Sequence, residues 1–180
     1  SVINVSCFGG NNGIITLTTN GGVGGYGYNW SNGETTNITT GLSTGSYSVT
    51  ISDANNCSTT MAVSVTDPSE LTSITTIDTL FNGQQISCAN GNDGSASVMA
   101  SGGIPGYTFQ WVNGETTMTV TGLQASTYPV TVTDAQGCIA TAIAVISEPP
   151  VLTGTIIGTD IGCNGGSDGS ADLTPAGGSP

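Results

Sequence analysis

The chain has 180 residues and contains 12 acidic side chains but no Lys, Arg or His, so its formal net charge is −12. Without cations it cannot neutralise phosphate groups, which excludes nucleic-acid binding and attraction to an anionic membrane surface. It also lacks the residues of a Ser/His triad, a Schiff-base lysine or a cationic phosphate clamp, so we predict that it is not an enzyme. No apolar run approaches the roughly 18 residues of a membrane span, and we predict no membrane insertion.

One sequence pattern occurs twice. Moving back 81 residues from the second copy aligns cysteines, aromatic residues and turns with the first copy without a gap. A third copy opens at Cys163 and stops partway, at Pro180. This predicts a window on a tandem array, with repeats at 1–71 and 72–152 and the start of a truncated repeat at 153–180. The main matches are Cys7 with Cys88, Tyr26 with Tyr107, Trp30 with Trp111, and Cys57 with Cys138.

Alternating apolar and polar residues predict a series of short strands in each copy. In the first copy the series begins near Ile15, and an aromatic strand follows over 26–30. Asn32-Gly33 comes next and favours a type I′ hairpin turn, in which both central residues have positive φ. Further strands are predicted up to Leu42, over 47–51 and over 61–65, before an exit at Pro68.

The fold class that this pattern predicts is all-β. Six or seven short strands per copy, with Cys…Trp…Cys spacing, indicate tandem Ig-like β-sandwich repeats of about 80 residues. The likeness is broad, because Tyr47 lies ten residues before Cys57, whereas antibody-type domains place a tyrosine about two residues before the second cysteine. Trp30 and Trp111 are predicted to lie in the cores, and stacking on sugars is the alternative interpretation.

The cysteine spacing predicts one disulfide within each repeat. Cys7 and Cys57 are separated by 50 residues, as are Cys88 and Cys138, so these pairings are the simplest. The partner of Cys163 is then expected outside this window. A bond from Cys57 to Cys88, between neighbouring repeats, is the alternative. Disulfides imply an oxidising, extracellular compartment, and the absence of histidine and of CxxC spacing argues against zinc.

Two loops carry oxygen ligands of the kind that calcium prefers. The candidate ligands are Asn90, Asn92 and Asp93 in one loop of the second copy, and Asp53 and Asp134, which open equivalent loops of the two copies. Asp and Asn also stabilise short turns through their side chains, and this is the competing interpretation. No other cofactor is expected.

Three segments resemble the SprB repeat of large cell-surface adhesins from gliding Bacteroidetes. They are Cys-Asn-Gly-Gly-Ser-Asp-Gly-Ser-Ala at 163–171, Ser-Gly-Gly-Ile-Pro-Gly-Tyr-Thr-Phe-Gln-Trp at 101–111 and Tyr-Pro-Val-Thr-Val-Thr-Asp-Ala-Gln-Gly-Cys at 128–138. The resemblance implies an extracellular surface filament, exported by the type IX route and used in adhesion or gliding, and it implies no catalytic residue. Asp78-Thr79-Leu80 also resembles the O-glycosylation site of secreted Bacteroidetes proteins, which makes Thr79 a candidate.

The predicted function is structural: the repeats form the stalk or filament of an adhesin, and their partners are neighbouring repeats. One alternative is a binding module that holds glycans or solid surfaces, with or without calcium. Another is a subunit of an extracellular filament, in which strands of one chain complete the sheet of the next. Exposed aromatic residues would favour the binding module, and buried tryptophans would count against it.

Overall fold

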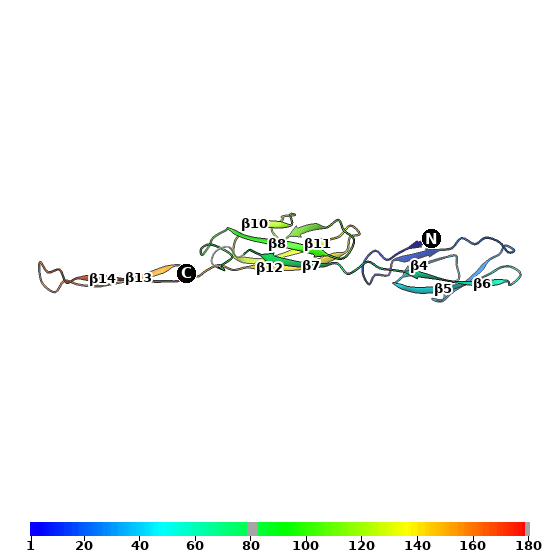
Figure 1. Cartoon of the computed structure of the whole chain (residues 1–180), viewed down its shortest axis with the longest axis horizontal. Coiled ribbons are helices and arrows are strands. Elements are labelled where there is room, and N and C mark those ends of the chain that lie inside the picture. The colour runs from blue at the N-terminus through cyan, green and yellow to red at the C-terminus, as the bar shows by residue number, and fades with distance from the viewer. Residues whose placement is uncertain (79–82, 179–180) are drawn as a thin grey trace. The chain divides into compact units, whose positions relative to one another are not determined.

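The computed structural model describes residues 1–78 and 83–178, which form β-strands and loops with no helix (Figure 1). The all-β prediction is confirmed. Accordingly, the described residues include no helix with the length and apolar character of a membrane span. The chain folds into two compact units. Unit 1 comprises residues 1–72, 100–108 and 132–140, and unit 2 comprises residues 73–99, 109–131 and 141–180.

The first repeat is a sandwich of two antiparallel three-stranded sheets, ordered β1-β2-β4 and β3-β5-β6. Both sheets contribute to one core: Ile15 and Leu42 come from the first sheet, and Trp30, Val49 and Val65 from the second. The strands are β1 (Val2–Ile3), β2 (Gly13–Thr16), β3 (Gly27–Trp30), β4 (Ile38–Leu42), β5 (Gly45–Ser52) and β6 (Ser58–Val65).

Strand β5 shows why the alternating pattern forms a sheet with one buried face. Val49 and Ile51 are buried, whereas Ser48 is exposed. The register places Val49 directly opposite Trp30 of β3. Since successive side chains of a strand point to opposite faces, the period-two pattern predicted both the strand and its inner side correctly.

The two tryptophans are core residues, as predicted. Trp30 is 3% exposed and Trp111 is 1% exposed. Each indole N–H donates a hydrogen bond to a backbone carbonyl six residues later, that of Thr36 or Thr117, at 2.9 Å. A buried indole needs such a partner, and these bonds fix the ring where it cannot stack on a ligand.

The Asn-Gly turn differs from the prediction. Of Asn32 and Gly33, Gly33 alone has a positive φ, at 90°. Its N–H donates a hydrogen bond to the carbonyl of Trp30. The turn therefore starts one residue earlier, with Ser31 and Asn32 as its central residues. The N–H of Trp30 also bonds to the carbonyl of Glu34, which gives a type I turn followed by a glycine bulge. The strands on either side, β3 and β4, enter different sheets, so no hairpin forms.

The second repeat has the same two-sheet arrangement, with orders β10-β8-β7 and β12-β11-β9. Val98 and Val120 of the first sheet and Val130 of the second are all buried. The strands are β7 (Thr72–Ile77), β8 (Gly94–Ser101), β9 (Thr108–Trp111), β10 (Thr119–Leu123), β11 (Ser126–Thr133) and β12 (Ile139–Ile146). The tandem β-sandwich prediction is thus confirmed, while the exact repeat boundaries stay a prediction.

The third copy contributes one antiparallel hairpin, β13 (Thr153–Thr159) and β14 (Ser170–Ala176), with Thr153 opposite Ala176 and Thr159 opposite Ser170. All side chains of both strands are exposed. Leu173 is 63% exposed, although Val98, its equivalent in the second copy, is fully buried.

Removing a core side chain should destabilise the first repeat. We expect Ile15→Ala, at a position 1% exposed, to lower the free energy of unfolding by about 2–5 kcal/mol, because burial is lost and a cavity remains. The matched control is Ile38→Ala, at a position 43% exposed. Differential scanning calorimetry of both variants tests this, and equal losses would contradict the assigned core.

Candidate functional site: the Cys7–Cys138 disulfide and its two turns

The structure contains a disulfide between Cys7 and Cys138, whose Cα atoms are 5.7 Å apart and which are separated by 131 residues. Both cysteines belong to unit 1. Among the described residues Cys57, Cys88 and Cys163 are exposed and form no disulfide. The predicted bonds Cys7–Cys57 and Cys88–Cys138 are therefore wrong, and the alternative bond Cys57–Cys88 is not formed either.

Strand β6 explains why the first predicted pairing fails. Cys57 immediately precedes β6, whereas the segment around Cys7 bonds to residues just beyond its other end. There the N–H of Val5 donates to the carbonyl of Thr66, and the N–H of Gly9 donates to the carboxylate of Asp67. Eight residues of strand span about 26 Å. A disulfide requires Cα atoms within roughly 7 Å, so Cys7 cannot reach Cys57.

The second repeat repeats this arrangement. Cys138 immediately precedes β12, and the N–H of Asn90, two residues after Cys88, donates to the carboxylate of Glu148, two residues after β12 ends, at 2.6 Å. Each repeat therefore has two kinds of cysteine. We call Cys7, Cys88 and Cys163 first cysteines, and Cys57 and Cys138 second cysteines. The observed bond joins the first cysteine of one repeat to the second cysteine of the next.

The first-cysteine turn has the same geometry in all three copies. A backbone N–H three residues on bonds to the cysteine carbonyl, from Gly10 to Cys7, from Gly91 to Cys88 and from Gly166 to Cys163. A side chain five residues after the cysteine closes the turn. The oxygens of Asn12, Asp93 and Asp168 accept the N–H groups of Ser6, Ser87 and Gly162 at 3.0, 3.1 and 3.2 Å.

These bonds explain most of the predicted calcium ligands of this loop as turn residues. Hydrogen bonds from the side chain and backbone of Ser87 lower the pKa of Asp93. Asn90 has a positive φ of 62°, and its equivalent in the first copy is Gly9, with a φ of 68°. Asn is one of the few residues other than glycine that adopt this conformation readily. Asn92 is exposed, and no such role is evident for it.

The second-cysteine turn is closed by an aspartate whose two oxygens accept backbone N–H groups. In the second repeat one carboxylate oxygen of Asp134 accepts hydrogen bonds from the backbone N–H groups of Gln136 and Cys138, both at 2.9 Å. The other oxygen accepts one from the N–H of Ile104 at 2.8 Å. Asp134 is only 5% exposed. The N–H of Ile104 is the main cause of a lowered pKa for Asp134.

Asp53 does the same in the first repeat. Its carboxylate accepts hydrogen bonds from the N–H groups of Asn55 and Cys57 at 2.9 Å and of Val23 at 3.1 Å. These bonds lower the pKa of Asp53, and the bond from Val23 has the largest effect. Asp53 and Asp134 thus have the hydrogen-bond partners of turn residues. Within residues 1–78 and 83–178, no group of three or more His, Cys, Asp or Glu side chains is placed to hold a metal ion. Calcium binding stays a prediction.

Thr79, the candidate glycosylation residue, lies outside the described residues.

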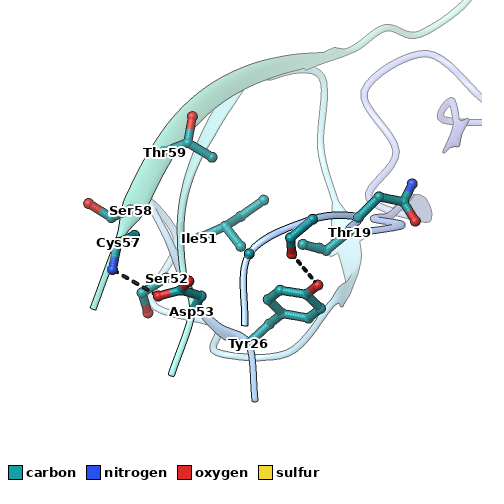
Figure 2. Close-up of a pocket in the computed structure, with 11 residues that line it drawn as sticks. Thr19, Tyr26, Ile51, Ser52, Asp53, Cys57, Ser58 and Thr59 are labelled. Atoms are coloured by element: carbon teal, nitrogen blue, oxygen red, sulfur yellow. Dashed lines mark hydrogen bonds between the residues drawn. The ribbon is translucent and has the colours of Figure 1, made fainter. Parts of the chain in front are cut away.

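Figure 2 shows a pocket beside Cys57, at this end of the first repeat. Its volume is about 220 Å³, and its lining includes Gly21, Gly22, Tyr26, Asp53 and Cys57. Tyr26 closes one side by donating a hydrogen bond to the carbonyl of Gly21 at 2.5 Å. A second hollow, of about 390 Å³, is lined by Cys7, Phe8, Glu70, Leu71, Gly137, Cys138 and Ile139, all in unit 1.

The SprB repeat model matches residues 1–35 and 81–116, which are corresponding parts of the two copies. Both full copies are thus similar to the SprB repeat over these residues. The resemblance predicted from the motifs is therefore confirmed in both full copies. The match supports a structural repeat of a surface protein.

Comparison with solved structures found distant likenesses. An amphioxus IgVJ-C2 molecule shares 16% identity, with 79% of this chain and 99% of that one covered and a TM-score of 0.36. A C-terminal fragment of intimin, in complex with the intimin-binding domain of its translocated receptor, shares 16% identity, with 81% and 55% covered and a TM-score of 0.37. A Dscam structure concerned with isoform specificity shares 10% identity, with 68% and 38% covered and a TM-score of 0.33. Likenesses this weak carry no argument about function. The comparison with curated proteins found no match.

Sequence reasoning missed the actual cysteine pairing, although a signal was present. The strand predicted over 61–65 already separated Cys57 from the exit at Pro68. The position of Cys7 beside that exit was missing, because it follows only from the hydrogen bonds from Val5 to Thr66 and from Gly9 to Asp67.

Loss of the disulfide should destabilise the chain. In the chain-entropy model a bond across 131 residues contributes about 5 kcal/mol. We expect Cys7→Ser to lower the melting temperature and to make it insensitive to reductant. Cys57→Ser is the matched control and should leave melting unchanged. An equal effect of the two substitutions in thermal denaturation would contradict the assigned bond.

Acid should weaken the second-cysteine turn. The pKa of the Asp134 carboxyl is lower in the folded state than in the unfolded state, where it is about 3.9. Its charged form therefore stabilises the folded state above about pH 3.9, and this contribution is lost as the pH falls through the lower pKa of the folded state. We therefore expect stability to decline below about pH 4. Asp134→Asn should be less stable at neutral pH and show a shallower acid decline, unlike the control Glu115→Gln. Denaturant titrations between pH 2 and 7 measure both slopes.

Proposed function

We propose that this chain is a non-enzymatic structural segment of an extracellular bacterial surface protein, in which SprB repeats form the stalk or filament of an adhesin that serves attachment or gliding. The observation that carries the proposal is the Cys7–Cys138 disulfide, because it ties one repeat covalently to the next. The SprB match supports a surface protein, and export by the type IX route would agree with it. A structural disulfide also suits an oxidising compartment outside the cell.

The bond would limit extension under load. When a stalk is pulled from its ends, force enters a repeat through the backbone and passes through the disulfide. The 131-residue separation between Cys7 and Cys138 is then bypassed, so that part of the chain cannot lengthen even if its strands separate. A fully extended segment of that size would span about 450 Å. The disulfide would therefore keep an adhesin short under tension.

Single-molecule force spectroscopy tests this role. The chain, held by its two ends, should gain about 450 Å more contour length in reductant than in oxidant, because reduction releases the bypassed segment. Cys7→Ser should give the long extension in both conditions, and Cys57→Ser should behave as the unmodified chain. Equal contour lengths for the oxidised and reduced chain would contradict the proposal.

Surface location is tested separately. Antibodies against this chain should label intact source cells without permeabilisation. Labelling that requires permeabilised cells would contradict the surface role, whatever the result under force.

A glycan-binding or surface-binding module is the first alternative. The burial of Trp30 and Trp111 counts against sugar stacking by the largest aromatic side chains. A glycan array probed with the chain, in calcium and then in chelator, separates the two functions. Binding that disappears in chelator would favour the calcium-dependent module over the stalk.

A filament assembled by strand addition is the second alternative, and the β13–β14 hairpin favours it. Ile156, Ile157 and Leu173 are each more than 60% exposed, and a hairpin alone is marginally stable. Another chain could cover these side chains. Concentration-dependent association in analytical ultracentrifugation, abolished by Leu173→Glu, would support this role.

A further inference from the structure

Each copy has a pair of adjacent glycines after its second strand. The pairs are Gly21–Gly22, Gly102–Gly103 and Gly177–Gly178, and all six residues have positive φ, between 58° and 87°. In the second and third copies the reason for glycine is visible. A Cβ on Gly102 would lie 1.9 Å from the carbonyl oxygen of Glu70, and one on Gly177 would lie 2.1 Å from that of Val151.

These close approaches are made by the segment through which the chain leaves the preceding repeat. We call residues 67–71 and 148–152 the exit segments; they read Asp-Pro-Ser-Glu-Leu and Glu-Pro-Pro-Val-Leu. The N–H of Gly103 donates to the carbonyl of Ser69 at 2.8 Å, and the N–H of Gly178 donates to that of Pro150 at 2.9 Å. Two glycine pairs therefore hold two exit segments in the same way.

The exit segment also places a leucine against the second glycine of each pair. A Cβ on Gly103 would lie 3.2 Å from Cβ of Leu71, and one on Gly178 would lie 3.3 Å from Cδ1 of Leu152. Leu71 is 9% exposed, whereas Leu152 is 69% exposed. In the second copy the contact thus combines one backbone hydrogen bond with one buried apolar side chain, which is a common way to recognise an extended segment.

The first copy has the same pair without an exit segment. Among the described residues nothing lies within 4 Å of a Cβ built on Gly21, and the three atoms nearest to one built on Gly22 all belong to Asp53. The space is the pocket of about 220 Å³ that Gly21, Gly22, Tyr26, Asp53 and Cys57 help to line (Figure 2).

The pocket in the first copy has the same surrounding hydrogen bonds as the site at Gly102–Gly103, which an exit segment fills. The hydrogen bond from Val23 to Asp53, at 3.1 Å, corresponds to that from Ile104 to Asp134, at 2.8 Å. The bond from Tyr26 to Gly21, at 2.5 Å, corresponds to that from Tyr107 to Gly102, at 2.7 Å. The empty pocket is therefore preorganised, and an occupant would not have to order it.

We propose that this pocket is the acceptor site for the exit segment of another SprB repeat. The segment lies extended across Gly21–Gly22, accepts a hydrogen bond from the N–H of Gly22 and places its leucine in the pocket. Specificity comes from the positive-φ glycines, which admit a backbone where any side chain would block it. Cys57, in the pocket lining, takes the place that Cys138 takes beside Glu70 and Leu71.

The inference rests on the proposed structural role of the repeats and names the contact by which one repeat receives another. Its test measures docking at one pocket, and not surface location or extension under force. The two proposals can therefore fail separately.

The first measurement uses the 180-residue chain, labelled with ¹⁵N, and a capped synthetic peptide with the sequence of Val65–Thr72. We expect shifts of the Gly22 and Val23 amides that grow with peptide up to the millimolar range, since a free peptide lacks the high effective concentration of a linked segment. The amides of Gly103 and Gly178 are internal controls, because their sites are filled. The matched control peptide replaces its leucine with aspartate.

The second measurement follows alkylation of Cys57, with exposed Cys88 as the internal control. Cleavage after Glu34, Glu70 and Glu115 places these two cysteines on fragments 35–70 and 71–115. At half saturation the peptide should slow labelling of Cys57 about twofold and leave Cys88 unchanged. Absence of both the Gly22 shift and the Cys57 protection, or equal effects at Gly103 and Cys88, would overturn the proposal.

Discussion

The bond between Cys7 and Cys138 is the constraint on which the account depends, and the folding of each repeat explains it. Strand β6 carries the chain from Cys57 to the segment that holds the Cys7 turn, so the two cysteines of one repeat lie about a strand length apart. They cannot form a disulfide with each other. The turns around them are formed alike whether the cysteine is bonded or not, as the shared hydrogen bonds of Asp53 and Asp134 show. Each full repeat therefore holds its two cysteines in ordered turns that lie too far apart for a bond between them.

Much of the fold was predictable because its causes are local. The alternation in β5 follows from the geometry of a strand with one buried face, and the same alternation recurs 81 residues later in β11. Trp30 and Trp111 could be placed in the cores because they fall in phase with neighbouring apolar residues. Repetition strengthened each of these inferences, since a chance pattern would not occur twice with the same spacing.

The features that sequence reasoning missed depend on positions across the fold. Equal cysteine separations are compatible with bonds inside or between repeats, and the length of β6 between them decides the question. The role of Asp53 depends on Val23, thirty residues away, whose N–H the carboxylate accepts. In the Asn-Gly turn, the bulge at Gly33 depends on the bond between Trp30 and Glu34, so the dipeptide alone suggested a turn one residue too late. The dipeptide indicated that a turn would form, and the backbone hydrogen bonds on either side of it determined which type.

The most direct test of the central claim is disulfide mapping of the Cys163→Ser chain, alkylated without reduction and cleaved after Glu34, Glu70 and Glu115. This divides the four remaining cysteines among fragments 1–34, 35–70, 71–115 and 116–180. The account predicts that 1–34 is joined to 116–180, and that 35–70 and 71–115 are recovered singly with alkylated thiols. Recovery of 1–34 joined to 35–70, with 71–115 joined to 116–180, would show that each repeat closes its own disulfide and would contradict the account.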